Sequence, residues 1–266
     1  MNTNLIFDLY AIVFAKPIFI KFNKFIFNLS LRGMGILNYR NYTLSGEKCF
    51  LQDFFSNKEN LDVGVVFDVG ANSGSYSKTL INLFPSLSIF AFEPHPITFT
   101  KLNNTSKEYP FASFNLGMSD NIQTAALYDY SNNTGSSHAS IYKKVFDNIH
   151  QSESIKYEIE MSTIDSFCDK KNISLITLLK IDTEGHEYQV LQGAKRMLTE
   201  HRIQAIHFEF NEMNAISKVF MNDFIELLPD FSFFRMLPSG LISIDNYRAC
   251  HLEIFAYQNI VAIRNE

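Results

Sequence analysis

The first strong pattern of apolar and polar residues lies at positions 63–93. Residues 63–69 are almost all apolar and rich in β-branched side chains, which predicts a parallel strand buried on both faces. Residues 87–92 predict a second buried strand, and the segment between the two predicts a turn and a helix that either Ser73 or Ser75 can cap. We therefore expect a βαβ unit, in which a helix joins two parallel strands.

Later segments continue this alternation of strands and helices. Further strands are expected at residues 112–118, 178–181 and 203–210, and helices at 96–109, 187–198 and 215–228. The buried stripe of the second helix should consist of Val190, Leu191, Ala194, Met197 and Leu198. Residues 231–237 and 252–263 should form an antiparallel pair at one edge of the sheet. The pattern predicts an α/β fold with a mostly parallel sheet and helices on both faces.

Residues 1–45 form a separate N-terminal extension, and the main domain is expected at residues 46–266. The longest apolar run of the extension is far shorter than the ~20 residues of a membrane-spanning helix, so we expect two short helices broken near Pro17. Apolar residues lie all around these helices, which predicts that they dock on another surface. Packing on the chain's own main domain is favoured. The alternatives are an oligomer interface or a peripheral membrane contact assisted by Lys16, Lys21 and Lys24.

Residues 121–160 interrupt the alternation of strands and helices. Residues 125–130 and 156–161 alternate weakly between polar and apolar, and a loop rich in Asn, Gly and Ser follows the first of them. We expect an antiparallel insertion of two or three strands above the ligand-binding edge of the sheet, where it either shapes a substrate site or is structural decoration. His138 is expected to be an ordinary loop histidine.

Composition narrows the functional classes. The chain has 266 residues, 46% of them hydrophobic, and can form one large core. Its net charge of -5 argues against a nucleic-acid partner, because such proteins carry a basic surface. Cys49, Cys168 and Cys250 are far apart and lack metal-ligand spacing, which is typical of reduced thiols in a cytoplasmic protein.

The turn after the first strand indicates what kind of nucleoside binds. Gly70 and Gly74 are spaced G-x-x-x-G, whereas dinucleotide-binding proteins have G-x-G-x-x-G, and Asp68 stands just before the first glycine. A carboxylate there repels phosphate and favours a positively charged ligand such as S-adenosylmethionine. Glu93 follows the second strand, at the usual position of an acid that binds ribose hydroxyls.

A second group of acids lies at the ends of later strands. Asp182 follows residues 178–181, with Lys180 on the same face, and Glu209 lies near the end of the next strand. Open parallel sheets bind ligands at the carboxyl ends of their strands, so we expect Asp68 and Asp182 to meet. Several acids in one place require a cationic ligand, a metal or shifted pKa values.

Three motifs, in this order, carry a family resemblance: V-F-D-V-G-A-N-S-G, F-E-P and L-K-I-D-T-E-G-H-E-x-x-V-L-x-G-A. Residues 33–265 resemble the FkbM family of S-adenosylmethionine-dependent methyltransferases. The resemblance implies a Rossmann-like class I methyltransferase fold, with a seven-stranded sheet whose final strand is reversed. It also implies S-adenosylmethionine as cofactor and O-methylation of a small molecule or glycan, often a sugar or polyketide.

Carried over by position, the resemblance assigns cofactor-binding roles. Glu93 would bind the ribose hydroxyls, and Ser119 and Asp120 would lie beside the adenine. Asp182 could also touch the methionine end of the cofactor. The methionine and sulfonium side of the pocket would be formed by Asp68, Gly70, Asn72 and Gly74.

The expected reaction is in-line transfer of the sulfonium methyl group to an alcohol oxygen, with a base that removes the alcohol proton. The candidate bases are Asp182, Glu184, His186 and Glu209, of which His186 ordinarily titrates nearest neutrality. Lys180 could steer or neutralise one of the acids. Asp182 and Glu209 could hold magnesium, but no residue pattern requires a metal.

Two other functions stay open at this point. A nucleotide-dependent oxidoreductase can use the same βαβ unit, although the G-x-G-x-x-G pattern is absent. A catalytically inactive methyltransferase fold could act as a scaffold through its aromatic N-terminus, although the intact acids argue against this.

Overall fold

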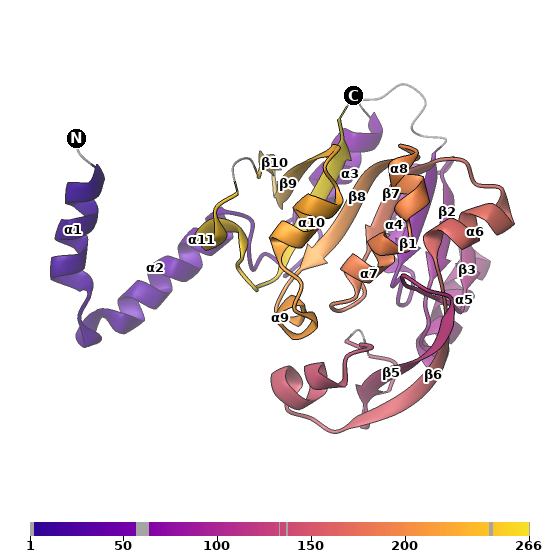
Figure 1. The fold of residues 1–266 in the computed structure, drawn as a ribbon, viewed down its shortest axis with the longest axis horizontal. Coiled ribbons are helices and arrows are strands. Elements are labelled where there is room, and N and C mark those ends of the chain that lie inside the picture. The colour runs from indigo at the N-terminus through magenta and orange to yellow at the C-terminus, as the bar shows by residue number, and fades with distance from the viewer. Residues whose placement is uncertain (1–2, 57–63, 133, 137, 245–246, 266) are drawn as a thin grey trace.

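The main sheet of the computed structural model, which describes residues 3–56, 64–132, 134–136, 138–244 and 247–265, has eight strands in the order β10-β9-β11-β8-β7-β1-β2-β3 (Figure 1). They are β1 (Val65–Val69), β2 (Ser88–Phe92), β3 (Ala112–Phe114), β7 (Ile176–Ile181), β8 (Ile203–Phe210), β9 (Phe231–Leu237), β10 (Gly240–Ser243) and β11 (Gln258–Arg264). Strands β3, β2, β1, β7 and β8 are parallel, whereas β11 is antiparallel to β8 and β9. The expected α/β fold with a reversed final strand is confirmed.

Three details of the sheet differ from the sequence prediction or lie outside it. The sheet has eight strands rather than seven, because β10 forms a hairpin with β9. The strand expected at residues 112–118 is divided: β3 ends at Phe114, opposite Phe92 at the end of β2, so later residues have no partner in this sheet. Residues Gly117–Met118 instead form β4, which pairs with β6 in a second sheet. The expected strand start at Val63 lies outside the described residues.

Two layers of helices cover the main sheet (Figure 1). One layer consists of α3 (Glu47–Ser56), α4 (Ser75–Leu83) and α5 (Pro96–Glu108). Phe50, Leu80 and Leu102 pack these helices against the sheet. The other consists of α6 (Ile164–Lys171), α7 (Glu187–Gln192), α8 (Lys195–Thr199) and α10 (Met221–Leu227), with α9 (Met213–Ser217) and α11 (Ala249–Leu252) beside it. Both faces of the central strands are therefore buried, as their continuous apolar runs predict.

Two expected helices are each divided into two. The first becomes α7 and α8, because the Asp165 carboxylate accepts hydrogen bonds from the backbone N–H groups of Arg196 (2.8 Å) and Met197 (3.1 Å) and so caps a new helix. The second becomes α9 and α10, because Lys218 has a φ of +59° and ends α9. The expected stripe on the first pair is buried, with Leu198 partly so.

Helix α4 begins without the serine cap that the sequence suggests. Its N-cap residue is Gly74, whose φ of +86° favours glycine. The hydroxyls of Ser73 and Ser75 lie 3.4 Å from each other and do not cap the helix.

Residues 123–162 form most of a small sheet beyond the carboxyl ends of the main strands (Figure 1). Strand β5 (Gln123–Tyr130) pairs antiparallel with β6 (Ser154–Ser162), and a short π-helix, η3 (Val145–His150), lies between them. The insertion is fastened to α5 by His95, whose Nε2 lies 3.3 Å from a carboxylate oxygen of the buried Asp129. The expected antiparallel strands are present in this segment.

The N-terminal helices are α1 (Thr3–Phe14) and α2 (Ile20–Gly33), joined by the short 3-10 helix η1 (Pro17–Phe19). Two helices broken near Pro17 were expected and are present. The prediction that this segment packs on the main domain is wrong for most of its length. No residue of α1 is buried, and Leu31 is the buried residue of α2. Figure 1 shows both helices projecting from the sheet domain. None of the helices in the described ranges is long and apolar enough to cross a bilayer.

We predict that Gly70→Ala destabilises the domain by about 3 kcal/mol or more. Gly70 has a φ of +78°, and an added Cβ would overlap the backbone carbonyl of Asp182 on the neighbouring strand end, which is not a flexible side chain. Thermal unfolding measures the effect. Gly33→Ala is the matched control, because a Cβ there meets nothing within 4 Å; equal melting temperatures for the two variants would contradict the prediction.

Candidate active site

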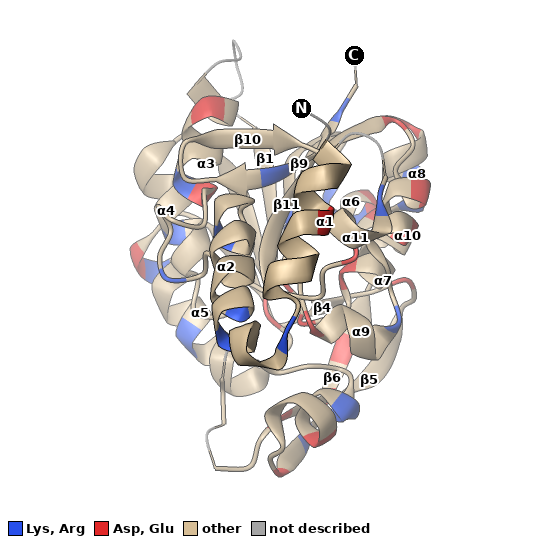
Figure 2. Ribbon diagram, turned by 90° about the vertical axis from the view of Figure 1, so that its left-hand side faces the viewer, with Lys and Arg blue, Asp and Glu red and all other residues tan. Residues whose placement is uncertain are grey.

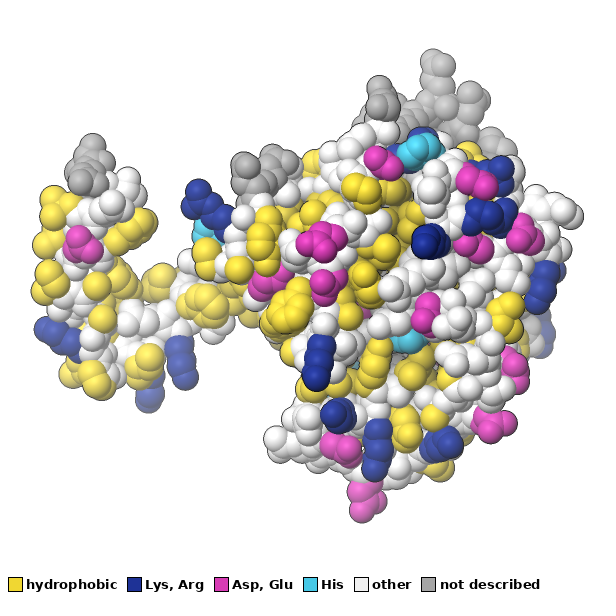
Figure 3. Space-filling view, in the orientation of Figure 1, with side chains coloured by type: hydrophobic (Ala, Val, Ile, Leu, Met, Phe, Trp, Pro, Cys, Tyr) yellow, Lys and Arg dark blue, Asp and Glu magenta, His cyan; other side chains and the backbone are white. Residues whose placement is uncertain are grey.

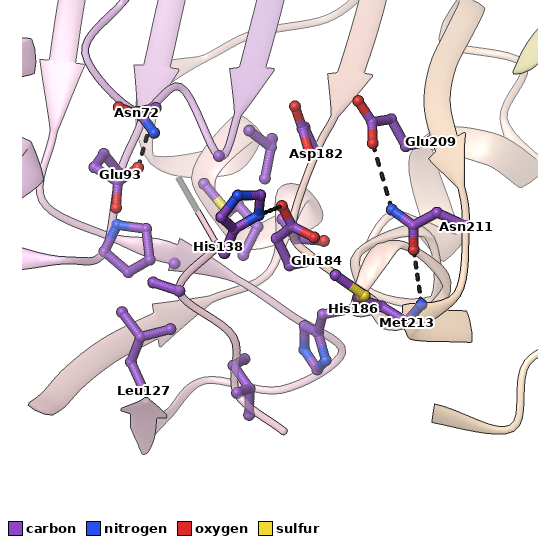
Figure 4. A pocket seen from close by; sticks show the side chains of 18 of the residues that line it. Asn72, Glu93, Leu127, His138, Asp182, Glu184, His186, Glu209, Asn211 and Met213 are labelled. Atoms are coloured by element: carbon purple, nitrogen blue, oxygen red, sulfur yellow. Dashed lines mark hydrogen bonds and ion pairs between the residues drawn. The ribbon is translucent and has the colours of Figure 1, made fainter. Parts of the chain in front are cut away.

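A cavity of about 470 Å³ lies at the carboxyl ends of β1, β2, β7 and β8. Strand order reverses between β1 and β7, and open α/β sheets bind ligands at such a point. The described residues that line the cavity include no Lys or Arg but five carboxylates: Glu93, Asp182, Glu184, Glu209 and Glu212. Figure 4 shows Glu93, Asp182, Glu184 and Glu209 arranged around one space. The cavity therefore favours a cationic ligand over a phosphate.

Two backbone groups hold Glu93 at the end of β2. Its carboxylate accepts hydrogen bonds from the N–H groups of Asn72 (3.0 Å) and His95 (2.8 Å). Gly70 N–H donates to Phe92 O (3.0 Å), so the turn after β1 wraps around the end of β2. Burial raises the pKa of Glu93 to about 7, although both hydrogen bonds act to lower it. A carboxylate has about four lone-pair sites, so Glu93 can still accept hydrogen bonds from hydroxyl groups.

Part of the cavity wall is apolar. It consists of Leu116, Met118 on β4, Leu127 on β5, Ile141 and Met161 on β6. Met118 and Met161 are buried and place thioether side chains at this wall. Methionine adapts its shape to flat rings, so this wall can accept an aromatic group.

Lys180 is buried beneath the acidic strand ends. Its Nζ lies 3.0 Å from Asp182 Oδ2. Burial alone would lower the pKa of Lys180, but the carboxylates of Asp182, Glu209 and Asp68 outweigh it and raise the pKa. Burial also raises the pKa of Glu209 well above its ordinary value, and Asp182 adds to this. One buried cation therefore offsets part of the negative charge of the cavity.

The insertion places His138 beside Glu184 at the cavity. His138 Nδ1 lies 3.5 Å from Glu184 Oε1 (Figure 4). The side chain of His138 is half exposed. The hydroxyl of Ser140 donates to Glu184 O (2.9 Å), which holds the loop against the end of β7. The pKa of His138 is raised above its ordinary value, and the largest cause is its hydrogen bond with Glu184. His138 was expected to be an ordinary loop histidine, but it lines the cavity.

His186 lines the cavity with both ring nitrogens engaged. Its Nε2 lies 2.9 Å from Ser119 Oγ, and its Nδ1 lies 3.2 Å from the Tyr142 hydroxyl. Burial lowers the pKa of His186 to about 4. At neutral pH it is uncharged and a weaker base than its residue type suggests.

Most residues singled out from the sequence line the cavity: Gly70, Asn72, Glu93, Asp182, Glu184, His186 and Glu209. Five do not: Asp68, Gly74, Ser119, Asp120 and Lys180. Asp68 is buried and accepts a hydrogen bond from the Ser77 hydroxyl (2.6 Å). The expected meeting of Asp68 and Asp182 is therefore indirect: Lys180, which lies opposite Asp68 in the sheet register, has its charge stabilised by both carboxylates. Within the described part of the chain, no three His, Cys, Asp or Glu residues are arranged to hold a metal ion.

Three further lining residues were not among the site residues predicted from the sequence, although the segment around Leu37 and Tyr39 was expected to cover the entrance of the main domain. Leu37 and Tyr39 come from the segment after α2, and Tyr257 comes from just before β11. Leu37 N–H donates to Tyr257 O (2.7 Å), and the rings of Tyr39 and Tyr257 lie 5.8 Å apart. Only the folded chain brings these distant positions together.

The family described as Methyltransferase FkbM domain matches residues 68–237. The chain is 22% identical over 189 residues to the 2-O-methyltransferase NoeI of Sinorhizobium fredii, a match over 66% of this chain and 76% of that protein. It is 26% identical over 179 residues to the hexuronic acid methyltransferase AglP of Haloferax volcanii, a match over 66% of each chain.

A solved structure of methyltransferase FkbM from Methylobacillus flagellatus KT aligns with a TM-score of 0.48 at 15% identity, over 90% of this chain and 60% of that one. The family match covers more than half of this chain and includes the ends of β1, β2, β7 and β8 around the cavity. The chain therefore belongs to the FkbM methyltransferase family.

Proposed function

We propose that this protein transfers a methyl group from S-adenosylmethionine to a hydroxyl group of a sugar or a related small molecule or glycan. The observation that carries the proposal is the cavity wall at the point where strand order reverses, with five carboxylates and no lysine or arginine among its described residues. Such a wall suits the positively charged ammonium and sulfonium groups of the cofactor and opposes the pyrophosphate of a dinucleotide. Membership of a methyltransferase family also argues against the alternative that the protein is a nucleotide-dependent oxidoreductase.

The residues present fit S-adenosylmethionine. Glu93 has lone pairs left for the two ribose hydroxyls after accepting the N–H groups of Asn72 and His95. Met118 and Met161 would lie against the adenine ring, and Asp182 would face the methionine end. When bound, the cofactor supplies a methyl group on a sulfonium sulfur, which is a good leaving group.

A sugar hydroxyl is the proposed acceptor. The names of two relatives support it, a 2-O-methyltransferase and a hexuronic acid methyltransferase. An alcohol must lose its proton as its oxygen attacks, so the site needs a base close to the cavity.

The His138–Glu184 pair fits the role of this base better than His186. A base works best when its pKa lies near the working pH, and Glu184 holds the pKa of His138 above its ordinary value while burial holds that of His186 at about 4. Burial also raises the pKa of Glu184, although its hydrogen bond with His138 acts to lower it. Glu184 would orient the imidazole, and Lys180 would hold Asp182 in place at 3.0 Å.

We predict that Glu93→Ala weakens binding of both S-adenosylmethionine and its demethylated product by ~1.5–3 kcal/mol, because charge-assisted hydrogen bonds to the shared ribose are lost. Glu93→Gln keeps the side-chain shape and should weaken both ligands less. Calorimetry measures the affinities, with the exposed Glu108→Gln as the control. Unchanged affinity in Glu93→Ala, with an unchanged melting temperature, would remove the cofactor assignment.

We also expect the affinity for the cofactor to depend on pH through Glu93. Because burial raises the pKa of Glu93 to about 7, this side chain is partly protonated near neutrality, and protonation removes acceptor sites for ribose hydroxyls. Cofactor affinity should therefore rise between about pH 6 and about pH 8 and then level off. Glu93→Gln should flatten this rise; an identical pH profile in that variant would assign the dependence to another group.

We also predict that His138→Asn lowers kcat ~10²–10⁴-fold with little change in cofactor affinity, as expected for loss of a general base. Because the neutral imidazole is the active form, the rate should rise with pH through the pKa of His138. Glu184→Gln should move this rising limb to lower pH, since the carboxylate that raises the pKa is gone.

The measurement is methyl transfer to a panel of sugar acceptors across the pH range. His201→Asn is the matched control, because His201 also has an acidic neighbour, Asp230 at 3.9 Å, but is exposed and does not line the cavity. Full turnover in His138→Asn would move the base to Asp182 or Glu209.

A further inference from the structure

Helix α2 exposes an apolar stripe that its sequence pattern would normally bury. Phe22, Phe25, Ile26 and Leu29 follow the spacing i, i+3, i+4, i+7 and so lie on one side of the helix, while Ile20 and Phe27 are also exposed on another side. The exposed fractions of Phe22, Phe25, Ile26 and Leu29 are 43%, 59%, 38% and 51%. In a globular domain such a stripe faces the core. Here it faces outward, which indicates a partner surface.

Helix α1 is more apolar still and forms one unit with α2. Leu5, Phe7 and Ile12 are 57%, 65% and 69% exposed. The Tyr10 hydroxyl donates to Asn23 Oδ1 (2.7 Å), and the rings of Phe14 and Phe22 lie 5.6 Å apart. These contacts fix the bend between the helices, so we call residues 3–33 the N-terminal arm.

The arm is basic although the whole chain has a net charge of -5. Its acidic residue is Asp8, and its four basic residues are Lys16, Lys21, Lys24 and Arg32. Figure 2 shows Lys and Arg gathered near the bend, and Figure 3 shows hydrophobic side chains over both helices beside this basic cluster. Lys21, Lys24 and Arg32 follow helical spacing on a side of α2 different from its apolar stripe.

We propose that the N-terminal arm is a peripheral membrane anchor that lies in the surface of a bilayer containing anionic lipids. The apolar side chains would enter the boundary between headgroups and acyl chains, and the lysines would contact lipid phosphates. With 12 and 14 residues, α1 and α2 are about 18 and 21 Å long, shorter than the hydrocarbon core of about 30 Å. The arm therefore lies on the bilayer and does not span it.

A second copy of the chain is the less favourable occupant of this surface. A twofold dimer brings identical patches together, so the basic residues of one arm would face those of the other. Asp8 alone cannot neutralise four basic residues, whereas anionic headgroups supply the missing charge.

The segment that directly follows the arm forms part of the cavity wall. Arg32 donates to Leu37 O (2.8 Å), Ile36 forms a bridge with Gln258, and Leu37 and Tyr39 line the cavity. Binding of the arm to a bilayer would therefore hold the cavity close to the membrane surface.

Co-sedimentation of the full chain with vesicles tests the proposal. We expect binding to vesicles of phosphatidylcholine with phosphatidylglycerol, weaker binding at high salt, and little binding to phosphatidylcholine alone. Each basic residue near an anionic surface is worth about fivefold in partitioning, so Lys21→Glu/Lys24→Glu should bind at least about 25-fold more weakly. Phe25→Gln/Leu29→Gln should also lose binding while keeping good helix formers.

Matched controls lie elsewhere on the surface. Lys143→Glu/Lys144→Glu makes the same charge change at exposed positions, and Ile155→Gln/Leu175→Gln removes apolar side chains that are 40% and 39% exposed. Both should bind vesicles like the natural chain, and thermal unfolding should show all variants folded. Absence of binding by the natural chain, or equal loss in the controls, would overturn the proposal. So would light scattering that shows a dimer separated by Phe25→Gln/Leu29→Gln without any vesicle binding, because the surface would then belong to a second copy.

Discussion

A single buried ammonium group, that of Lys180, allows the acidic strand ends of this protein to stand side by side. Its Nζ contacts Asp182 at 3.0 Å, and the carboxylates of Asp68, Glu209 and Glu47 also stabilise its charge. Lys180 is buried whereas the side chain of Asp182 is 35% exposed, so the lysine bears most of the desolvation cost of this pair and depends on the surrounding carboxylates. The acids that line the cavity therefore depend on a lysine that does not line it. The acidic groups still outnumber the one lysine, so a cationic ligand would be stabilised at this wall.

The small sheet of residues 117–162 completes the cavity that the main sheet begins. It supplies the apolar residues Leu127 and Met161 and the loop that carries His138. Among the polar contacts that hold it, the buried Asp129 lies 3.3 Å from His95 at the start of α5, and Ser140 donates to the backbone after β7. Because these contacts come from opposite sides of the cavity, the insertion bridges the two halves of the parallel sheet. A loop fixed in this way can position a side chain for chemistry.

The sheet domain and the N-terminal arm differ in where their apolar side chains lie. The sheet domain buries its apolar side chains in two cores, one on each face. The N-terminal arm leaves its apolar side chains exposed and gathers basic residues among them. The division of the chain at residue 45 stays a prediction, since Leu31 and Ile36 already pack on the sheet domain.

The amino-acid sequence by itself determined the strands and the acids at their ends. Continuous apolar runs identified β1, β2, β7 and β8, and Glu93, Asp182 and Glu209 followed from their positions in or just after those runs. This information is local, because side-chain alternation along a strand needs no distant contact. Tertiary structure decided which polar groups face the cavity: Asp68 turns to Ser77, and His138 reaches Glu184 across 46 positions of sequence. It also decided that α7 and α8 are separate, because Asp165 caps the second of them, and that the arm leaves the domain. These outcomes depend on hydrogen bonds and burial between segments far apart in the chain, which periodicity does not encode.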